Sequence, residues 1–173
     1  PIYGEDWFLN ISAIADTTIE PRRVVTPVGI QGSQNPNSND IFSGDEQFLF
    51  AQNLILPIIY YKGNTTFKPP EQEYHFTPVL NYNYVRVKDV RALKIDPSEG
   101  RTRRDYFIGL QELFADIHLH NVSDRYDFDS IRFGIQPFST DFRGFLFQGN
   151  RFGVCVFGNR WNHRCEWNLG WLR

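Results

Sequence analysis

The sequence has no methionine, only two cysteines and no apolar run long enough for a transmembrane helix. Such a helix needs about 18 continuous apolar residues, and the longest run, LILPIIYY at 54–61, is interrupted by Pro57. Helical membrane spans are therefore excluded, whereas membrane strands stay open because they carry a weaker signal per segment. The start at Pro1, without a signal-like segment, predicts a processed or partial chain.

The chain also lacks the charge and the motifs of several functional classes. Its net charge is -2, and nucleic-acid binders usually carry a basic face, so we expect no nucleic-acid partner. It has no Walker loop, dinucleotide fingerprint, GxSxG or HExxH motif. We therefore expect neither an enzyme nor a cofactor.

Aromatic residues are abundant, at 16% of the chain, with 16 phenylalanines. This content is high for a soluble domain and ordinary for a protein with aromatic anchors at a membrane interface. The aromatic residues lie in segments that alternate apolar and polar side chains, which is the period of a β-strand. In the clearest segment, Ile131, Phe133 and Ile135 alternate with Arg132 and Gln136.

The alternating segments predict an all-β chain with about seven strands of roughly 8–12 residues. The main ones are Phe8–Thr17, Phe48–Asn64, His75–Lys88, Leu113–His120, Ser130–Phe138 and Cys165–Leu172. A polar loop at about 25–47 and a charged turn at 96–105 separate some of them. We expect a single domain over 1–173, an antiparallel meander of long strands. A helix is the alternative at 107–118, but no cap or stop signal frames one.

Alternation fits two opposite orientations. A soluble β-sandwich or lipocalin-like binding module buries its apolar face and exposes its polar face. A transmembrane β-barrel turns the apolar face to lipid and the polar face to a wet interior. Small or amide residues on the polar faces and aromatic strand ends are features of the barrel. Even with these features, the pattern alone leaves the two classes about evenly balanced.

Residues 126–147, YDFDSIRFGIQPFSTDFRGFLF, and the stretch that follows resemble bacterial outer-membrane β-barrels of the porin-like or TonB-dependent-receptor-like kind. The pattern R-x-G-x-Q-x-F appears as Arg132, Gly134, Gln136 and Phe138. AQNLIL at 51–56 and FTPVLNYNY at 76–84 are further similar stretches. The resemblance implies that Arg132 and Gln136 face the lumen and that Gly134 relieves crowding at the wall.

The resemblance further implies a place in the bacterial outer membrane and a lipid bilayer as partner. The chain would act as a passive channel or structural wall component, alone or within a larger assembly of envelope proteins. It stops at Arg173 inside a strand pattern, without the terminal aromatic residue usual in such barrels, and has too few strands for a large barrel. We therefore expect a fragment. No plug domain or TonB-box-like segment supports active transport.

Charged residues near the resembling segment are candidates for a constriction that filters solutes. They are Arg132, Gln136, Asp127, Asp129, Asp141 and Arg143. The alternative, which we favour, is that these groups are wall pairs that satisfy one another.

Two smaller candidates remain. Asp116, His118 and His120 alternate on one strand face, a geometry that can ligate zinc or copper, but a third strong ligand is missing and solvated histidines are favoured. Cys155 and Cys165 would lie opposite each other in a hairpin turning around 159–161, close to disulfide range. Two free thiols are an equal alternative.

Overall fold

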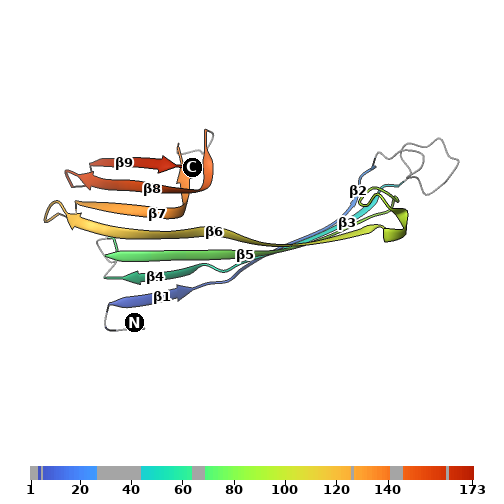
Figure 1. The fold of residues 1–173 in the computed structure, drawn as a ribbon, viewed down its shortest axis with the longest axis horizontal. Helices are drawn as coiled ribbons and strands as arrows, with labels where there is room; N and C mark the ends of the chain where they lie inside the picture. The colour runs from blue at the N-terminus through green and yellow to red at the C-terminus, as the bar shows by residue number, and fades with distance from the viewer. Residues whose placement is uncertain are drawn as a thin grey trace. The chain divides into compact units, whose positions relative to one another are not determined.

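The computed structural model describes residues 4, 6–26, 44–63, 69–125, 127–140, 146–162 and 164–173. Nine strands form one hydrogen-bonded sheet with antiparallel pairings (Figure 1). The strands are β1 (Trp7–Ile11), β2 (Ile14–Arg23), β3 (Glu46–Ile55), β4 (Ile58–Lys62), β5 (Gln72–Val87), β6 (Thr102–Asn121), β7 (Phe128–Ser139), β8 (Gln148–Arg160) and β9 (Cys165–Leu172). A short 3-10 helix, η2, covers Pro97–Glu99. The all-β prediction is confirmed.

The sheet is open over the described residues. Its strand order is β1-β4-β5-β6-β7-β8-β9, with β3 pairing both β2 and β5. β1 and β9 stand at the two ends of this order and do not pair with each other. The fold is thus an antiparallel sheet, and closure into a barrel stays a prediction.

The structure has more strands than the sequence predicted because two expected strands are interrupted. The segment 8–17 is divided between β1 and β2, and the segment 48–64 is divided between β3 and β4. The interruptions face each other, since the Ser12 N–H donates to the Pro57 carbonyl at 3.0 Å. Pro57 has no N–H of its own for the ladder, which explains why the strand is interrupted at this position.

β6 is longer than predicted, at 20 residues. The expected charged turn at 96–105 is wrong for residues 102–105, which begin this strand. Their charges are compatible with a strand because Arg103 and Asp105, two residues apart, form an ion pair at 2.8 Å. The helical alternative at 107–118 is also excluded, because the whole segment is strand.

The chain divides into two compact units. Unit 1 comprises 1–13, 55–79 and 110–173, and unit 2 comprises 14–54 and 80–109. β5 and β6 therefore contribute one part to each unit. The expected single domain over 1–173 stays a prediction, and most of the polar loop at 25–47 lies outside the described residues.

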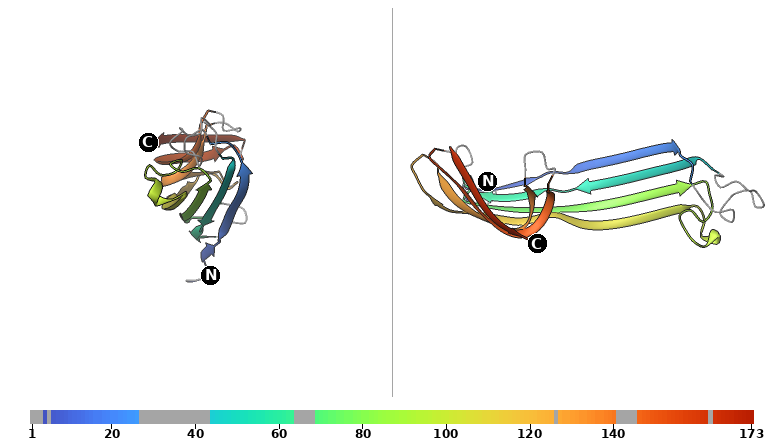
Figure 2. Two further views of the ribbon diagram at one scale, coloured as in Figure 1. Left: turned by 90° about the vertical axis from the view of Figure 1, so that its right-hand side faces the viewer. Right: turned by 90° about the horizontal axis from the view of Figure 1, so that it is seen from above.

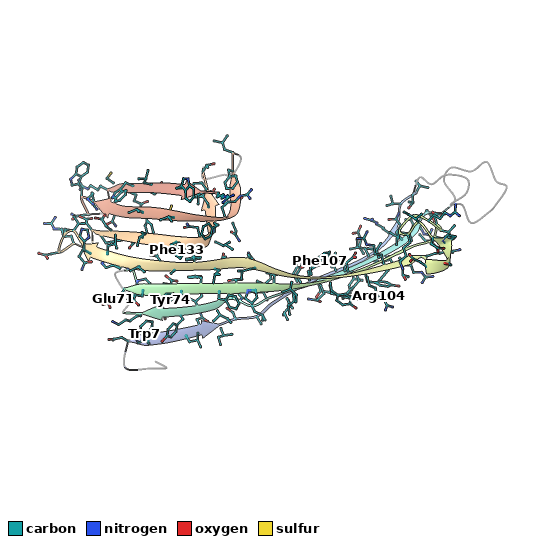
Figure 3. The ribbon with its side chains drawn as sticks, in the orientation of Figure 1. Trp7, Glu71, Tyr74, Arg104, Phe107 and Phe133 are labelled. Atoms are coloured by element: carbon teal, nitrogen blue, oxygen red, sulfur yellow. The ribbon has the colours of Figure 1, made fainter. Side chains whose placement is uncertain are left out.

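Unit 1 has two faces of opposite chemistry. We name the side with Leu113, Ile117, Phe133, Leu169 and Trp171 the apolar face, and the side with Asp116, Arg132, Gln136, Cys155 and Asn168 the polar face. The strand registers align these sets, for example Phe133 opposite Val154 and Val154 opposite Trp171. Phe133 and Tyr74, which extends this apolar face onto β5, are labelled in Figure 3.

The apolar face is open and the polar face is largely covered. Phe133, Trp171 and Leu169 expose 54%, 67% and 73% of their surface. On the polar face, Ser130 and Gln136 expose only 1% and 2%. Among all described residues only two apolar ones are buried, Val87 and Phe114. An ordinary apolar core is therefore absent from the described part of the chain.

A glycine pair lets the β7–β8 hairpin bend. Gly134 pairs with Gly153, and Gly134 has a φ of 127°, which side chains rarely allow. A Cβ atom at Gly134 would collide with the Leu113 carbonyl oxygen. Beyond this pair the adjoining ends of β7 and β8 turn out of the plane of the neighbouring strands (Figure 2). The bend brings Phe138, near the tip, to the same groove as Phe157.

Unit 2 is a smaller sheet with an aromatic row across β3, β5 and β6. Phe50 contacts Tyr82 at 5.9 Å between ring centroids, and Tyr82 contacts Tyr106 at 5.0 Å. Asn81 donates to Asn53 at 2.6 Å, so amide side chains also link β3 and β5. At the end of this sheet the Val87 N–H donates to the Arg101 carbonyl at 3.1 Å, just before β6 begins.

Candidate functional site

Arg132 is the centre of the polar face of unit 1. It lies opposite Asp116 in the β6–β7 ladder, and its Nε and Nη2 atoms donate to Asp116 Oδ2 at 3.0 and 2.7 Å. The side chains are 29% and 14% exposed, respectively. The pair is therefore partly withdrawn from water, where a charge-assisted hydrogen bond is stronger than on a surface.

Two aromatic rings hold the Arg132 guanidinium in place. Its central carbon lies 4.8 Å from the Phe114 ring centroid and 5.3 Å from that of Phe157. A cation over an aromatic face is attracted by the ring quadrupole. Phe114 also stacks on His75 with centroids 4.2 Å apart. Arg132 is thus fixed in both position and orientation.

A second polar group lies on the same face, between β5 and β6. His75 Nε2 is 2.6 Å from Glu73 Oε1, and His75 Nδ1 is 3.8 Å from Glu112 Oε2. The Thr77 hydroxyl donates to Glu112 at 3.4 Å. Together with Asp116 and Arg132, these residues make a row of paired charges across three strands. Within this row each carboxylate has a cationic or hydrogen-bonding partner.

Glu73, His75, Glu112 and Phe114 were not identified from the sequence. His75 and Phe114 belong to predicted strands, whereas Glu73 and Glu112 lie just before the predicted starts of those strands, so the available signal was the continuation of the same alternation over residues 73–77 and 112–116. The missing information was the pairing of β5, β6 and β7, which alone brings these side chains together. Charged groups facing one another across strands can filter ions or rigidify a wall.

The other constriction candidates have different partners. Asp129 binds Arg160 through two contacts of 2.8 and 3.0 Å. Asp127 accepts from the Ser123 hydroxyl at 2.9 Å and from the Asn162 N–H at 3.3 Å, at the end of the hairpins. Gln136 lies on the polar face with Arg132, as the pattern predicts. Asp141 and Arg143 lie outside the described residues.

The structure does not bring the metal candidates to one point. Asp116 is held by Arg132, His118 Nε2 lies 2.8 Å from Asn121 Oδ1, and His120 Nε2 lies 3.3 Å from Asp129 Oδ2. An irregularity in the β6–β7 ladder between His118 and His120 breaks their alternation. Among the described residues no group of three or more His, Cys, Asp or Glu side chains could hold a metal ion.

The structure distinguishes the two alternatives expected for the cysteines. Both thiols are free, because Cys155 lies opposite Gly170 and Cys165 lies opposite Arg160. The β8–β9 turn falls after Arg160, later than the turn around 159–161 that the pairing required. Trp161 and Asn162 adopt positive φ values of 57° and 58° there. Cys155 instead lines the polar face next to Arg132, its partner on β7.

No helix in the described ranges combines the length and apolar character required to cross a bilayer. Comparison of the chain with protein-family models, with curated proteins and with solved structures finds no match.

Proposed function

We propose that this chain forms part of the wall of a bacterial outer-membrane β-barrel, a passive channel or structural component of the envelope. The apolar face of unit 1 contacts lipid, and the polar face lines an aqueous interior. One observation carries the proposal: large apolar side chains are exposed on one face, while Ser130 and Gln136 are buried and the Arg132–Asp116 pair is half-buried on the other.

The free energy of solvation supports this orientation. Moving an exposed side chain of the size of Leu or Phe out of water is worth about 1.5–3 kcal/mol. Phe133, Leu169 and Trp171 are largely exposed, so in water they would not contribute this free energy. Hydrocarbon supplies it without a second protein layer. The ion-paired row around Arg132 would then face the wet side, as charges inside membrane proteins do.

The lengths of β7 and β8 are compatible with strands that cross a bilayer. A tilted strand crosses a bilayer with about 9–11 residues. β7 and β8 have 12 and 13 residues, which is sufficient with a short overhang. Every backbone group in a membrane must also be paired, and the β7–β8 ladder runs unbroken from Asp129 opposite Gly158 to Ser139 opposite Gln148.

The proposal is tested by reconstituting the protein in lipid vesicles and measuring tryptophan fluorescence with brominated acyl chains. We expect strong quenching, most of which is lost when Trp167 and Trp171 are both replaced by Phe, since both lie on the strand face of Leu169. Trp161→Phe serves as the control, because Trp161 lies in the β8–β9 turn and should contribute little. A protein that is soluble and folded in detergent-free buffer, with tryptophans protected from brominated lipid, is instead a soluble β-sandwich or lipocalin-like module.

A further inference from the structure

A groove lies on the polar face of unit 1, between the bent tip of the β7–β8 hairpin and β8 and β9. Its volume is about 420 Å³. Its lining includes the aromatic rings of Phe128, Phe138 and Phe157 and the side chains of Arg132, Gln136 and Asn168. The volume falls in the range of about 300–1,000 Å³ that is typical of small-molecule sites.

Gln136 lines the groove with an amide whose donor has no partner in the protein. It is 2% exposed, and its Nε2 atom is buried. A buried unsatisfied amide costs about 1–3 kcal/mol, and native proteins tolerate few of them. A rotation of this side chain toward the groove would let a ligand acceptor become the partner of Nε2.

The charge balance of the groove favours a neutral ligand. Arg132 is its lining cation, but Asp116 already holds Arg132 at 2.7 Å. Glu166 also lines the groove and adds a negative charge. An anionic ligand would meet Glu166, and a cationic ligand would meet Arg132. A purely apolar ligand would leave the amides of Gln136 and Asn168 without partners.

The lining therefore calls for a ligand with both an apolar surface and many hydroxyl groups. A sugar ring has this composition, because its C–H face can lie on an aromatic ring while its hydroxyl rim bonds to amides. Phe128 and Phe157 are suited to this contact, since their rings are perpendicular at 86° with centroids 6.4 Å apart and both line the groove. We propose that this groove binds a neutral saccharide of about disaccharide size.

The proposal does not depend on the membrane assignment, because every lining residue belongs to unit 1 and binding can be measured in detergent solution. Calorimetric titration uses maltose, cellobiose and N,N′-diacetylchitobiose as neutral probes, with digalacturonate and indole for comparison. We expect saturable binding of at least one neutral disaccharide. We expect Gln136→Leu to weaken it about tenfold while leaving the urea midpoint unchanged or raised, since the unsatisfied donor is gone.

Phe157→Ala should also weaken disaccharide binding about tenfold. The matched control is Phe152→Ala, because Phe152 is 47% exposed and its ring contacts that of Phe133 on the apolar face. The Phe152→Ala variant should bind the disaccharide as tightly as the unmodified protein. Three outcomes would overturn the proposal: no neutral disaccharide binds, Gln136→Leu binds as well as the original, or digalacturonate or indole binds more tightly than every neutral disaccharide.

Discussion

The two faces of unit 1 follow opposite rules. On the apolar face Leu169 and Trp171 are exposed by 73% and 67%, and they lie on an edge strand. On the polar face Arg132 is enclosed by an acid and two aromatic rings. A soluble sheet would cover the first set and expose the second. This difference is what the proposed orientation, with the apolar face toward lipid, requires.

The comparison also separates two sources of stability. Across the apolar face, aromatic contacts such as Phe133–Phe152, at 6.0 Å, link neighbouring strands without enclosing a core. Across the polar face, a histidine–carboxylate contact links β5 to β6, and an ion pair and a cation–π contact link β6 to β7. Each face can therefore be perturbed separately, and the expected effects differ in size.

The largest effect should follow from a charge placed on the apolar face. Leu169→Arg puts a guanidinium where lipid is expected and should destabilise the folded state in vesicles by about 2–4 kcal/mol near the bilayer midplane. Asn168→Arg is the matched control, because Asn168 is the neighbour of Leu169 on β9 and lies on the polar face. Urea unfolding from vesicles measures both. Equal effects of the two variants would remove the distinction between the faces.

A smaller loss of stability is expected from a side chain at the bend of the β7–β8 hairpin. Gly134→Ala should cost about 2–3 kcal/mol, because a side chain is strained at a φ of 127° and meets the backbone of Leu113 and Phe114. Gly109→Ala is the control, since a Cβ atom there meets nothing within 4 Å. The same unfolding measurement applies. A Gly134→Ala protein as stable as the original would contradict the bend.

Removal of one partner from the central ion pair should cost about 2 kcal/mol. Arg132→Leu leaves Asp116 covered and unpaired, whereas Arg132→Leu with Asp116→Leu should recover most of the loss. Arg22→Leu provides the surface comparison: its pair with Glu20 is 39% and 48% exposed, so we expect less than about 0.5 kcal/mol. If Arg132→Leu and Arg22→Leu lower the urea midpoint equally, the polar face is an ordinary wet surface.

The smallest effect concerns an exposed group outside both faces, which serves as a comparison in water. The Ser98 hydroxyl and N–H donate to the Asp96 carboxylate at 2.7 and 2.8 Å and lower the pKa of Asp96 below its ordinary value. The turn at η2 is therefore stabilised above the ordinary aspartate pKa and loses this contribution as pH falls through the lowered pKa. Carboxyl NMR titration should show the pKa rising toward its ordinary value in Ser98→Ala. No change in that variant would exclude the hydroxyl as the main cause.

The sequence predicted the faces better than it predicted the partners. Alternation alone placed Ile131, Phe133 and Ile135 opposite Arg132 and Gln136, because side chains of a strand must alternate. The bounds of β9 were predicted correctly as Cys165–Leu172, since strong alternation follows a turn-rich segment. The strand expected at 113–120 begins at Thr102 in the structure. The prediction was too short because charged residues such as Arg103 and Asp105 are also typical of turns.

Pairings between strands were beyond the reach of the sequence. Arg132 binds Asp116, rather than Asp127 or Asp129, because of the β6–β7 register, which contains an irregularity near His120. The placement of Cys155 opposite Cys165 failed for the same reason, since a shift of the β8–β9 turn changes every pair of opposing residues in the two strands. The row from Glu73 to Arg132 depends on three strands at once, and local patterns carry no information on such alignments.

The most direct test of the orientation is a spin-label scan of β9 in vesicles. Residues 166–171 are replaced singly by labelled cysteine in a Cys155→Ser, Cys165→Ser background, and collisions with oxygen and with a water-soluble nickel complex are measured. We predict a period of two: labels at Trp167, Leu169 and Trp171 meet oxygen in the lipid, and those at Glu166, Asn168 and Gly170 meet nickel in water. Equal nickel accessibility at all six positions, or the reverse alternation, would contradict the orientation proposed for both faces.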